Sequence, residues 1–347
     1  MAEEIVRISE EVKSLSELVK DRSLTLVDRV ESFEDIINIE VGDTSFSRAK
    51  NLERETGFRQ LYLKFEGSNP TGTHKDRIAF SQCLDALRRG YETITVATCG
   101  NYGASVSLAA QLAGLKCRIF IPQDYHTTRT EEMEYLGSKI KRVKGSYEDS
   151  VQYSSNQAAK YSWYDANPGG ANTSLQIMAY SEIAHEIYDQ LRDAPKIVSI
   201  PVSNGTVLAG IYRGFVSLYK RGKTTRIPLM VAASSTRKNA IVHSAIKGLD
   251  HCVNLVPEKI RETAVNEPLI NWHSFDGDEA LFAIRESKGS AFNISDKKMI
   301  KMSSLLKEKE GLHVLPASTA GLVALLEMNN AAELEPDRYV AVLTGKK

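Results

Sequence analysis

Residues 93–161 alternate between short stretches of β-branched and apolar residues and longer stretches with helical periodicity. The strand-like stretches are Thr93–Ala97, Lys116–Ile121 and Lys139–Val143, and the helical ones are Tyr102–Ala113, Arg129–Leu136 and Glu148–Tyr161. Parallel neighbouring strands need a long crossover, which is usually a helix. The alternation therefore predicts an α/β fold with a mostly parallel, twisted sheet flanked by helices.

A second set of strands and helices surrounds this segment. The predicted strands are Leu61–Phe65, Lys196–Pro201, Pro228–Ala232 and Tyr339–Leu343, and the predicted helices are 3–20, Ser47–Thr56, Lys75–Arg88, a helix ending near Leu191, Val207–Tyr219, Asp278–Glu286, Asp296–Lys309 and Ser318–Met328. Residues 233–275 have no clear pattern. A chain of 347 residues is long enough for two lobes. We expect a large domain of residues 1–80 plus 165–347 and a small, mobile domain of residues 81–164.

Composition excludes several classes of function. Lys and Arg total 44 and Asp and Glu total 44, so no basic excess is present to bind nucleic acid. No apolar run approaches the roughly 20 residues that span a membrane. The four cysteines have no CxxC spacing and the seven histidines no metal-ligand spacing, which predicts reduced thiols and no metal. The charged amino terminus lacks an apolar signal core, and we expect a cytoplasmic protein.

The segment Asn69–Arg77 places a lysine on a tight turn at the start of a helix. Pro70 fixes φ and Gly72 permits a positive φ, so the turn ends directly before Lys75. At that position the positive end of the helix dipole disfavours a charged ammonium and favours a nucleophilic amine. The segment therefore predicts a lysine able to form a Schiff base.

Two further loops join a predicted strand to a helix and are rich in small residues. They are Thr98–Ser105 and Pro201–Val207. Backbone N–H groups at a helix start suit an anion, and small residues let a phosphate approach the backbone.

A third position, Thr344, ends the last predicted strand, where a hydroxyl can hydrogen-bond a pyridine nitrogen without protonating it. Neither GxGxxG nor a Walker pattern occurs, which argues against a dinucleotide or ATP site.

These segments together resemble the threonine synthase-like family of pyridoxal phosphate (PLP) enzymes, which belongs to fold type II with tryptophan synthase β. Asn69–Arg77 resembles the lysine motif Asn-Pro-Thr-Gly-Ser-Phe-Lys-Asp-Arg, with Thr73 and His74 as the two changes. The other three matches are Thr98–Ser105 with Ser-Ser-Gly-Asn-Thr-Gly-Ala-Ser, Pro201–Val207 with Pro-x-Gly-Asn-Gly-Gly-Thr, and Val342–Gly345 with the start of Leu-Thr-Gly-His-Gly. The resemblance covers roughly residues 40–345 and implies a two-lobed fold in which each lobe has its own mostly parallel sheet.

The resemblance also implies a role for each candidate residue. Lys75 would hold PLP and act in catalysis, and Asn101 would contact the 3′-oxygen of PLP. The PLP phosphate would bind Ser203, Asn204, Gly205, Thr206 and Val207, and Thr344 would face the ring nitrogen. The substrate would meet Thr98, Cys99, Gly100, Tyr102, Asn172 and Thr173. A homodimer acting on a small amino acid is the expected assembly.

The reaction that the resemblance implies is conversion of O-phosphohomoserine to threonine and phosphate. The family binds the substrate phosphate with an arginine and a lysine, but the matching segment Asn167–Ser174 contains neither. Phosphohomoserine is therefore expected to be a poor substrate unless Arg129, Lys144 or Arg237 supplies a cation. The alternatives are β-elimination or β-replacement on serine, phosphoserine or O-acetylserine, and a non-catalytic amino-acid-binding protein.

Overall fold

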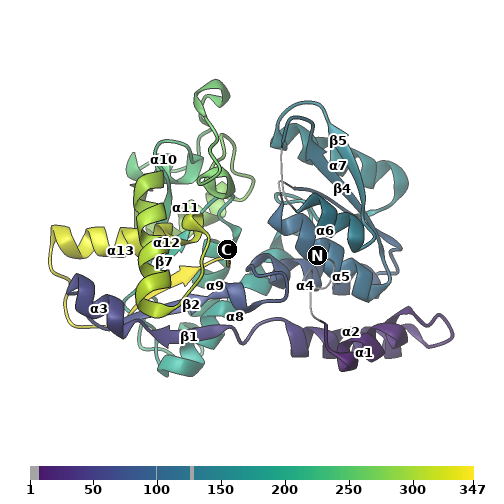
Figure 1. Cartoon of the computed structure of the whole chain (residues 1–347), viewed down its shortest axis with the longest axis horizontal. Helices are drawn as coiled ribbons and strands as arrows, with labels where there is room; N and C mark the ends of the chain where they lie inside the picture. The colour runs from purple at the N-terminus through teal and green to yellow at the C-terminus, as the bar shows by residue number, and fades with distance from the viewer. Residues whose placement is uncertain (1–7, 99, 126–128) are drawn as a thin grey trace. The chain divides into compact units, whose positions relative to one another are not determined.

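The computed structural model describes residues 8–98, 100–125 and 129–347. The chain divides into two compact units, and each contains its own sheet (Figure 1). Unit 1 comprises residues 1–42 and 69–176, and unit 2 comprises residues 43–68 and 177–347. The predicted class, two mostly parallel sheets flanked by helices, is confirmed.

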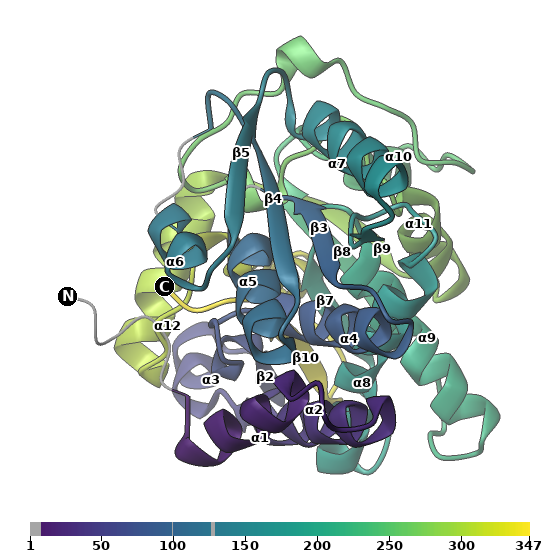
Figure 2. The same ribbon diagram turned by 90° about the vertical axis from the view of Figure 1, so that its right-hand side faces the viewer.

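Unit 1 contains a four-stranded, fully parallel sheet in the order β5-β4-β3-β6. Its strands are β3 (Thr93–Ala97), β4 (Lys116–Pro122), β5 (Lys139–Val143) and β6 (Tyr164–Asp165). Its helices are α1 (Glu10–Lys20), α2 (Leu26–Glu40), α4 (Lys75–Arg88), α5 (Asn101–Ala113), α6 (Thr130–Tyr135) and α7 (Tyr147–Tyr161). Figure 2 shows β5, β4 and β3 side by side. All five side chains of β3 are buried, as expected for a central parallel strand.

Helices α1 and α2 form an antiparallel pair that packs against α5 and α4. The sequence predicts α1 within residues 3–20 but not α2. Thr25 and Asp28 form a capping box that starts α2, a local signal that marks the helix. The Ser16 hydroxyl donates to the carbonyl of Leu112 at 3.0 Å, and the Arg29 guanidinium donates to the carbonyl of Val19 at 2.7 Å. The first contact attaches α1 to α5, and the second joins α2 to α1.

Unit 2 contains a six-stranded sheet in the order β1-β2-β10-β7-β8-β9. Its strands are β1 (Ser45–Arg48), β2 (Leu61–Phe65), β7 (Ile197–Pro201), β8 (Leu229–Ser235), β9 (Ser290–Ile294) and β10 (Tyr339–Leu343). Only β1 runs antiparallel to its neighbour. Its α-helices are α3 (Lys50–Thr56), α9 (Thr206–Lys220), α10 (Ala240–Ile246), α11 (Gly277–Glu286), α12 (Asp296–Glu310) and α13 (Ala320–Ala331), with 3₁₀ turns at 66–68, 257–259, 267–269 and 316–319. Helix α8 (Thr173–Leu191) begins in unit 1 and ends in unit 2.

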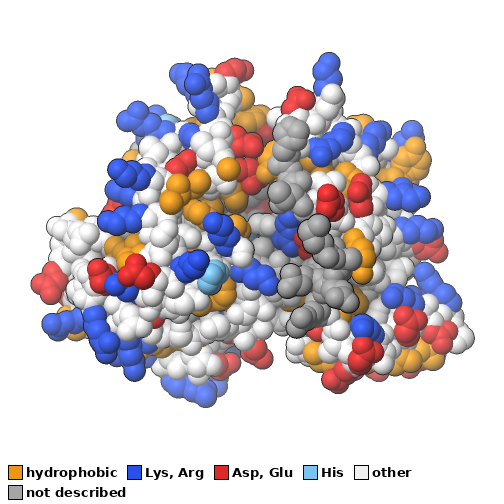
Figure 3. All heavy atoms as spheres, viewed as in Figure 1, with side chains coloured by type: hydrophobic (Ala, Val, Ile, Leu, Met, Phe, Trp, Pro, Cys, Tyr) orange, Lys and Arg blue, Asp and Glu red, His pale blue; other side chains and the backbone are white. Residues whose placement is uncertain are grey.

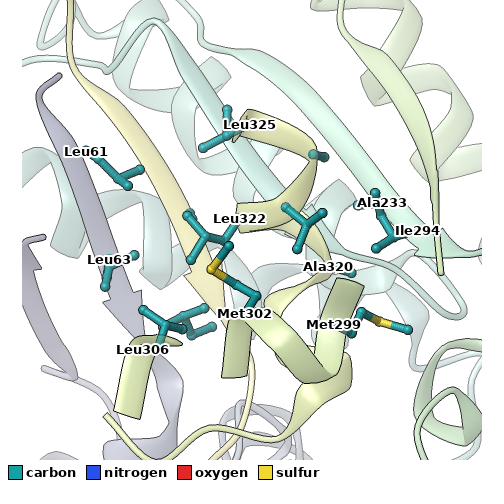
Figure 4. Close-up of a cluster of buried hydrophobic side chains, with 14 of the residues drawn as sticks. Leu61, Leu63, Ala233, Ile294, Met299, Met302, Leu306, Ala320, Leu322 and Leu325 are labelled. Carbon is teal, nitrogen blue, oxygen red and sulfur yellow. The ribbon is translucent and has the colours of Figure 1, made fainter. Parts of the chain in front are cut away.

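The core on one face of this sheet lies between the strands and helices α12 and α13 (Figure 4). Leu61 and Leu63 alternate along β2 toward that core, and Met302 and Leu322 meet them from the helices. Gly321 lets α13 approach β7, because an added Cβ would lie 2.9 Å from the backbone nitrogen of Ile200. The sheet is thus held rigidly from this side.

The predicted domain boundaries differ from the division into units. Residues 1–42 and 69–80 lie in unit 1, because α1, α2 and α4 pack on one another and on α5. Residues 165–176 also lie in unit 1, because β6 pairs with β3 at Thr95 and Asp165. Helix Ser47–Thr56 was predicted too long, since β1 includes Ser47 and pairs with β2.

Acidic and basic side chains are interspersed on the surfaces that Figure 3 shows, in keeping with the net charge of zero. Among the described residues, no helix is both long and apolar enough to cross a bilayer. Within the same residues, no cluster of His, Cys, Asp and Glu is suited to hold a metal ion.

Candidate functional site

Lys75 is the first residue of α4 and follows the turn that the sequence predicts. Gly72 has φ 84°, and its N–H donates to the carbonyl of Asn69 at 2.8 Å. The Lys75 side chain is half-buried, and its Nζ lies 5.6 Å from the centroid of the Tyr102 ring. The lysine is therefore presented at a helix start against an aromatic surface of unit 1.

Asp76 fixes the lysine turn to the body of unit 1. Its carboxylate is fully buried and accepts hydrogen bonds from the backbone N–H and the hydroxyl of Thr71 at 2.8 and 2.7 Å. The Thr71 hydroxyl also lies 2.9 Å from that of Ser105 on α5. Burial raises the pKa of Asp76 to about 6, while the hydrogen bonds from Thr71 and Ser105 oppose the shift. The carboxylate of Asp76, next to Lys75, is thus held in place by the hydroxyls of Thr71 and Ser105.

The loop that enters α5 is closed by its own threonine. The Thr98 hydroxyl accepts from the backbone N–H groups of Gly100 and Gly103 at 3.1 and 3.0 Å. Gly100 has φ 150°, a conformation that favours glycine. The Thr98 oxygen thus accepts two backbone donors, and its contact with substrate stays a prediction. Cys99, also predicted to contact substrate, lies outside the described residues.

Asn101 is the first residue of α5, and its side chain is held by Arg129. Nη1 of Arg129 donates to Oδ1 of Asn101 at 2.9 Å, and Nη2 donates to the Thr71 carbonyl at 3.1 Å. The same guanidinium forms two hydrogen bonds to the Glu132 carboxylate, at 2.7 and 2.8 Å. The structure therefore joins Asn101 and the lysine turn through one arginine.

Tyr102 directs its hydroxyl away from the loop surface. The hydroxyl donates to the carbonyl of Ala166 at 2.8 Å and accepts from Nε2 of Gln82. Gln176 completes this buried network by donating to Oε1 of Gln82 at 3.3 Å. The family has a threonine at this position, and the sequence predicts that Tyr102 contacts substrate. Its ring faces Lys75, so any contact it makes there is aromatic.

The segment after β6 carries the predicted substrate residues Asn172 and Thr173. Asn172 Nδ2 donates to the carbonyl of Asp165 at 2.6 Å, and Thr173 begins α8. The side chain of Asn167 is also occupied: it donates to Asp165 at 2.5 Å and accepts from the N–H of Ala97 at 2.7 Å. Because β6 and β3 are parallel neighbours, this segment and the loop into α5 leave the same edge of the sheet.

In unit 2, the predicted phosphate cup connects β7 to α9. Gly205 has φ 89°, and an added Cβ would lie 2.5 Å from Cβ of Ala280 and 2.7 Å from Cδ1 of Ile241. Among the described residues, no side chain caps the start of α9. The first backbone N–H groups of the helix, including those of Thr206 and Val207, are therefore suited to bind an anion.

Two asparagines hold the cup from inside. The Ser203 carbonyl accepts from Nδ2 of Asn239 at 3.0 Å and from Nδ2 of Asn271 at 2.9 Å. Oδ1 of Asn204 accepts from Asn271 at 3.3 Å and from the N–H of Phe275 at 3.4 Å. The side chain of Asn204 is therefore part of the support.

Thr206 departs from the expected geometry of the cup. The resemblance implies that Thr206 binds the PLP phosphate, but its hydroxyl donates to Oδ2 of the buried Asp276. The carboxylate is a strong acceptor, so it determines where this hydroxyl points. Thr206 is left to contribute its backbone N–H.

Thr344 directly follows β10, and its hydroxyl lies 3.2 Å from that of Ser318. Ser318 is buried and donates in turn to the carbonyl of Gly345 at 3.1 Å. Because β10 and β7 are adjacent and parallel, Thr344 and the cup emerge from neighbouring strands about 4.8 Å apart. Unit 2 thus brings together an anion site and a neutral hydroxyl at one edge of its sheet.

The three candidate cations differ in their surroundings. Arg129 is half-buried and forms an ion pair with Glu132, whereas Lys144 and Arg237 are exposed. The structure places Arg129 in contact with Asn101 and the lysine turn.

The model of the family described as pyridoxal-phosphate dependent enzyme matches residues 37–345. The chain belongs to this family. Threonine synthase of Methanocaldococcus jannaschii is 29% identical over 313 residues, which are 89% of this chain and 76% of that protein. Threonine synthase of Bacillus sp. is 29% identical over 312 residues, covering 89% of this chain and 84% of its own length. The protein is therefore a PLP-dependent, threonine synthase-like enzyme.

Solved structures share its fold at low identity. A maize serine racemase superposes with a TM-score of 0.75 at 18% identity, covering 92% of this chain and 94% of its own. The T.th. threonine deaminase gives a TM-score of 0.75 at 18% identity, with 92% and 97% covered. These matches establish PLP fold type II.

The residues of the cup fit a PLP phosphate. Gly205 occupies a position that a Cβ would fill, and the uncapped start of α9 offers backbone donors. On the adjacent strand end, Thr344 carries a hydroxyl rather than a carboxylate, and this hydroxyl donates to that of Ser318 at 3.2 Å. We take the cup as support for the predicted phosphate-binding residues, and the contact of Thr344 with the ring nitrogen stays a prediction.

Several residues of these loops were not identified as site residues from the sequence. Asp76 lies within the lysine motif and was recognisable there, but its burial was not. Gln82 and Gln176 share helical patterns with apolar neighbours, which conceals their contact. Asp276 lies 70 residues from its partner Thr206, directly after the segment 233–275 that has no clear pattern. Only folding brings these polar groups to the loops.

Proposed function

We propose that the protein is a threonine synthase-like lyase of amino-acid biosynthesis that breaks the Cγ–O bond of O-phosphohomoserine, releases phosphate, and adds water so that the hydroxyl of threonine forms at Cβ. The observation that carries the proposal is similarity to threonine synthases along 89% of the chain, with Lys75 opening α4 after the predicted turn. The absence of a GxGxxG or Walker pattern agrees with this cofactor class.

Four groups would hold the cofactor. Lys75 would bind it covalently, the start of α9 would bind its phosphate, Asn101 would donate to its 3′-oxygen, and Thr344 would face its ring nitrogen. When bound, PLP supplies an electron sink that stabilises negative charge on the substrate Cα. The neutral hydroxyl of Thr344 would leave the ring nitrogen unprotonated, which limits carbanion lifetime and suits elimination.

Lys75 has a second proposed role after the substrate amine has displaced it. Its amine would take the proton from the substrate Cα as a general base. The centroid of the Tyr102 ring lies 5.6 Å from the Nζ atom of this amine.

A second candidate is β-elimination or β-replacement on serine, phosphoserine or O-acetylserine. Residues 167–174 contain no Arg or Lys. The side chains of Asn167 and Asn172 donate to Asp165, so these donors are not directed at a phosphate. The charge of Arg129 is compensated by Glu132. A less charged leaving group, as in serine or O-acetylserine, fits these surroundings. A non-catalytic amino-acid-binding protein is the third candidate.

A steady-state panel at equal concentrations of O-phosphohomoserine, phosphoserine, O-acetylserine, serine and threonine separates the three. Efficient formation of threonine and phosphate supports the first candidate. Slow turnover of O-phosphohomoserine beside faster turnover of O-acetylserine or serine favours the second. Amino-acid-dependent changes in cofactor absorbance without turnover of any compound would favour the third.

We also propose that the protein is a cytoplasmic homodimer. The family resemblance supports the dimer, and four cysteines without disulfide-like spacing agree with a reducing compartment. Sedimentation velocity gives the oligomeric state, and cell fractionation gives the compartment.

A further inference from the structure

Arg129 connects three segments of unit 1 through one guanidinium. It donates to Oδ1 of Asn101 on α5, to the Thr71 carbonyl of the lysine turn, and twice to Glu132 on α6. The Arg129 and Glu132 side chains are only 20% and 15% exposed. The fork of the guanidinium fixes its orientation, because two of its nitrogens are held by one carboxylate.

The contact with Asn101 determines which way its amide faces. A guanidinium can only donate, so the amide atom it meets is the carbonyl oxygen Oδ1. The NH₂ group of the Asn101 amide then points away from Arg129. Among the described residues, Nδ2 of Asn101 has no hydrogen-bond acceptor. The arrangement leaves two N–H donors of Asn101 for an oxygen from outside the protein.

Glu132 also limits the ability of Arg129 to bind a substrate phosphate. The carboxylate accepts from Nε and Nη2 at 2.7 and 2.8 Å, and so compensates the charge of the guanidinium. A cation paired in this way gains less from a substrate phosphate than an unpaired one would. The contacts of Arg129 therefore indicate that it orients Asn101 rather than binds a substrate phosphate.

We propose that Arg129, anchored by Glu132, is a positioning residue that orients the Asn101 amide so that its N–H donors meet the cofactor's phenolate-type oxygen. This inference rests on the proposed cofactor role of Asn101. The hydrogen bond from Nη2 to the Thr71 carbonyl helps to hold the guanidinium in this orientation. Its effect on the cofactor is transmitted through Asn101.

A double-mutant cycle tests this dependence with Arg129→Met, Asn101→Ala and the combined variant. The readouts are the absorbance spectrum of bound PLP across pH, the dissociation constant of PLP, and kcat and KM. We expect Arg129→Met to shift the spectrum and lower kcat about 10- to 100-fold, the effect of losing a charge-assisted hydrogen bond, with a smaller change in KM. In the Asn101→Ala background, the same substitution should change each readout less than about twofold.

Arg54→Met is the matched control, because Arg54 also donates to an asparagine Oδ1, that of Asn51, but on an exposed surface. It should leave the spectrum and kcat unchanged. If Arg129→Met does not fold, Glu132→Gln replaces it in the cycle. That variant loosens the arginine and should give a smaller spectral shift that disappears with Asn101→Ala.

Two results would overturn the inference, and both are separable from failure of the proposed function. In the first, Arg129→Met (or Glu132→Gln in its place) changes the readouts equally in the unaltered and the Asn101→Ala backgrounds, which would show that the arginine acts on structure alone. In the second, the absorbance spectrum of bound PLP is unchanged in Arg129→Met or in Glu132→Gln, which would show the same. If borohydride reduction instead shows that PLP is not attached to Lys75 in the unaltered protein, the proposed cofactor site itself is wrong.

Discussion

The candidate loops of unit 1 and the cup of unit 2 are built in different ways. In unit 1, the candidate groups are side chains, and other side chains hold two of them: Arg129 holds Asn101, and Gln82 contacts the hydroxyl of Tyr102. In unit 2, the offered groups are mainly backbone N–H groups. The cup's side chains are directed to supporting residues, as Thr206 is to Asp276.

This difference affects how each region tolerates change. A side-chain site can be retuned by substitution, since the helix and strand that carry it remain. A backbone cup depends on close approach and on one positive φ, so added volume disturbs it directly. We therefore expect chemical effects from substitutions in unit 1 and packing effects in unit 2.

Lys75→Ala should have the largest effect, because it removes the group on which the unit 1 site depends. The variant should lose covalently bound PLP and its yellow colour, and activity should fall about 10²–10⁴-fold, as for loss of a general base. Borohydride reduction followed by peptide mapping gives the attachment site, with the exposed Lys144→Ala as control. A reduced adduct on another lysine would disprove the assignment.

Asp76→Asn tests the buried support of the lysine turn. The pKa of Asp76 is about 6 in the folded protein against 3.8 ordinarily, so between these values the folded state binds more protons. Stability from this group is then greatest below pH 3.8 and declines as pH rises to about 6, by up to about 3 kcal/mol.

The asparagine variant cannot ionise and should lack this decline. Denaturant unfolding at pH 4.5 and pH 7.5 (conditions at about the two ends of the window) measures it. The stability of the unaltered protein relative to Asp76→Asn should be higher at the lower pH. A difference that stays constant between the two conditions would show that Asp76 is not a strained carboxylate.

Gly205→Ala tests the packing limit of the cup. Its Cβ would lie 2.5 Å from Ala280, whereas at Gly222, which has φ 67°, an added Cβ meets nothing within 4 Å. Gly222→Ala should cost about 1–2 kcal/mol of unfolding free energy for its backbone conformation alone. Gly205→Ala should cost about 1–3 kcal/mol more and weaken PLP binding. Equal losses in the two variants would refute the packing argument.

Thr344→Asp should have the smallest effect on binding but a distinct effect on chemistry. The carboxylate would favour a protonated ring nitrogen, so PLP should be retained while the ratio of reaction products changes. Thr344→Ser, which keeps a hydroxyl beside Ser318, is the control and should behave like the unaltered protein. An identical product ratio for all three proteins would mean that another group meets the ring nitrogen.

Local sequence predicted the central elements well. The bounds of β2, β3, β5, β10 and α4 agree with their predictions. The strands β2, β3 and β10 are short runs rich in apolar residues between turns, β5 places Ile140 and Val143 among charged residues, and the helix follows a proline–glycine turn. The edge strands β1 and β9 were missed. Their residues are partly exposed and carry little apolar signal, so pairing with β2 and β8 is what makes them strands.

By itself, the sequence determined the cofactor class and the positions of the lysine, the glycine-rich loops and the terminal threonine, since turn chemistry and helix starts are local properties. Tertiary structure alone decided which polar groups these residues meet. Thr98 closes its own loop, Tyr102 turns its hydroxyl inward, and Thr206 bonds Asp276. The partners of Tyr102 and Thr206 come from segments remote in sequence, and a buried hydroxyl turns toward whichever acceptor or donor packing supplies. The same packing, rather than any linker in the sequence, set the division into units.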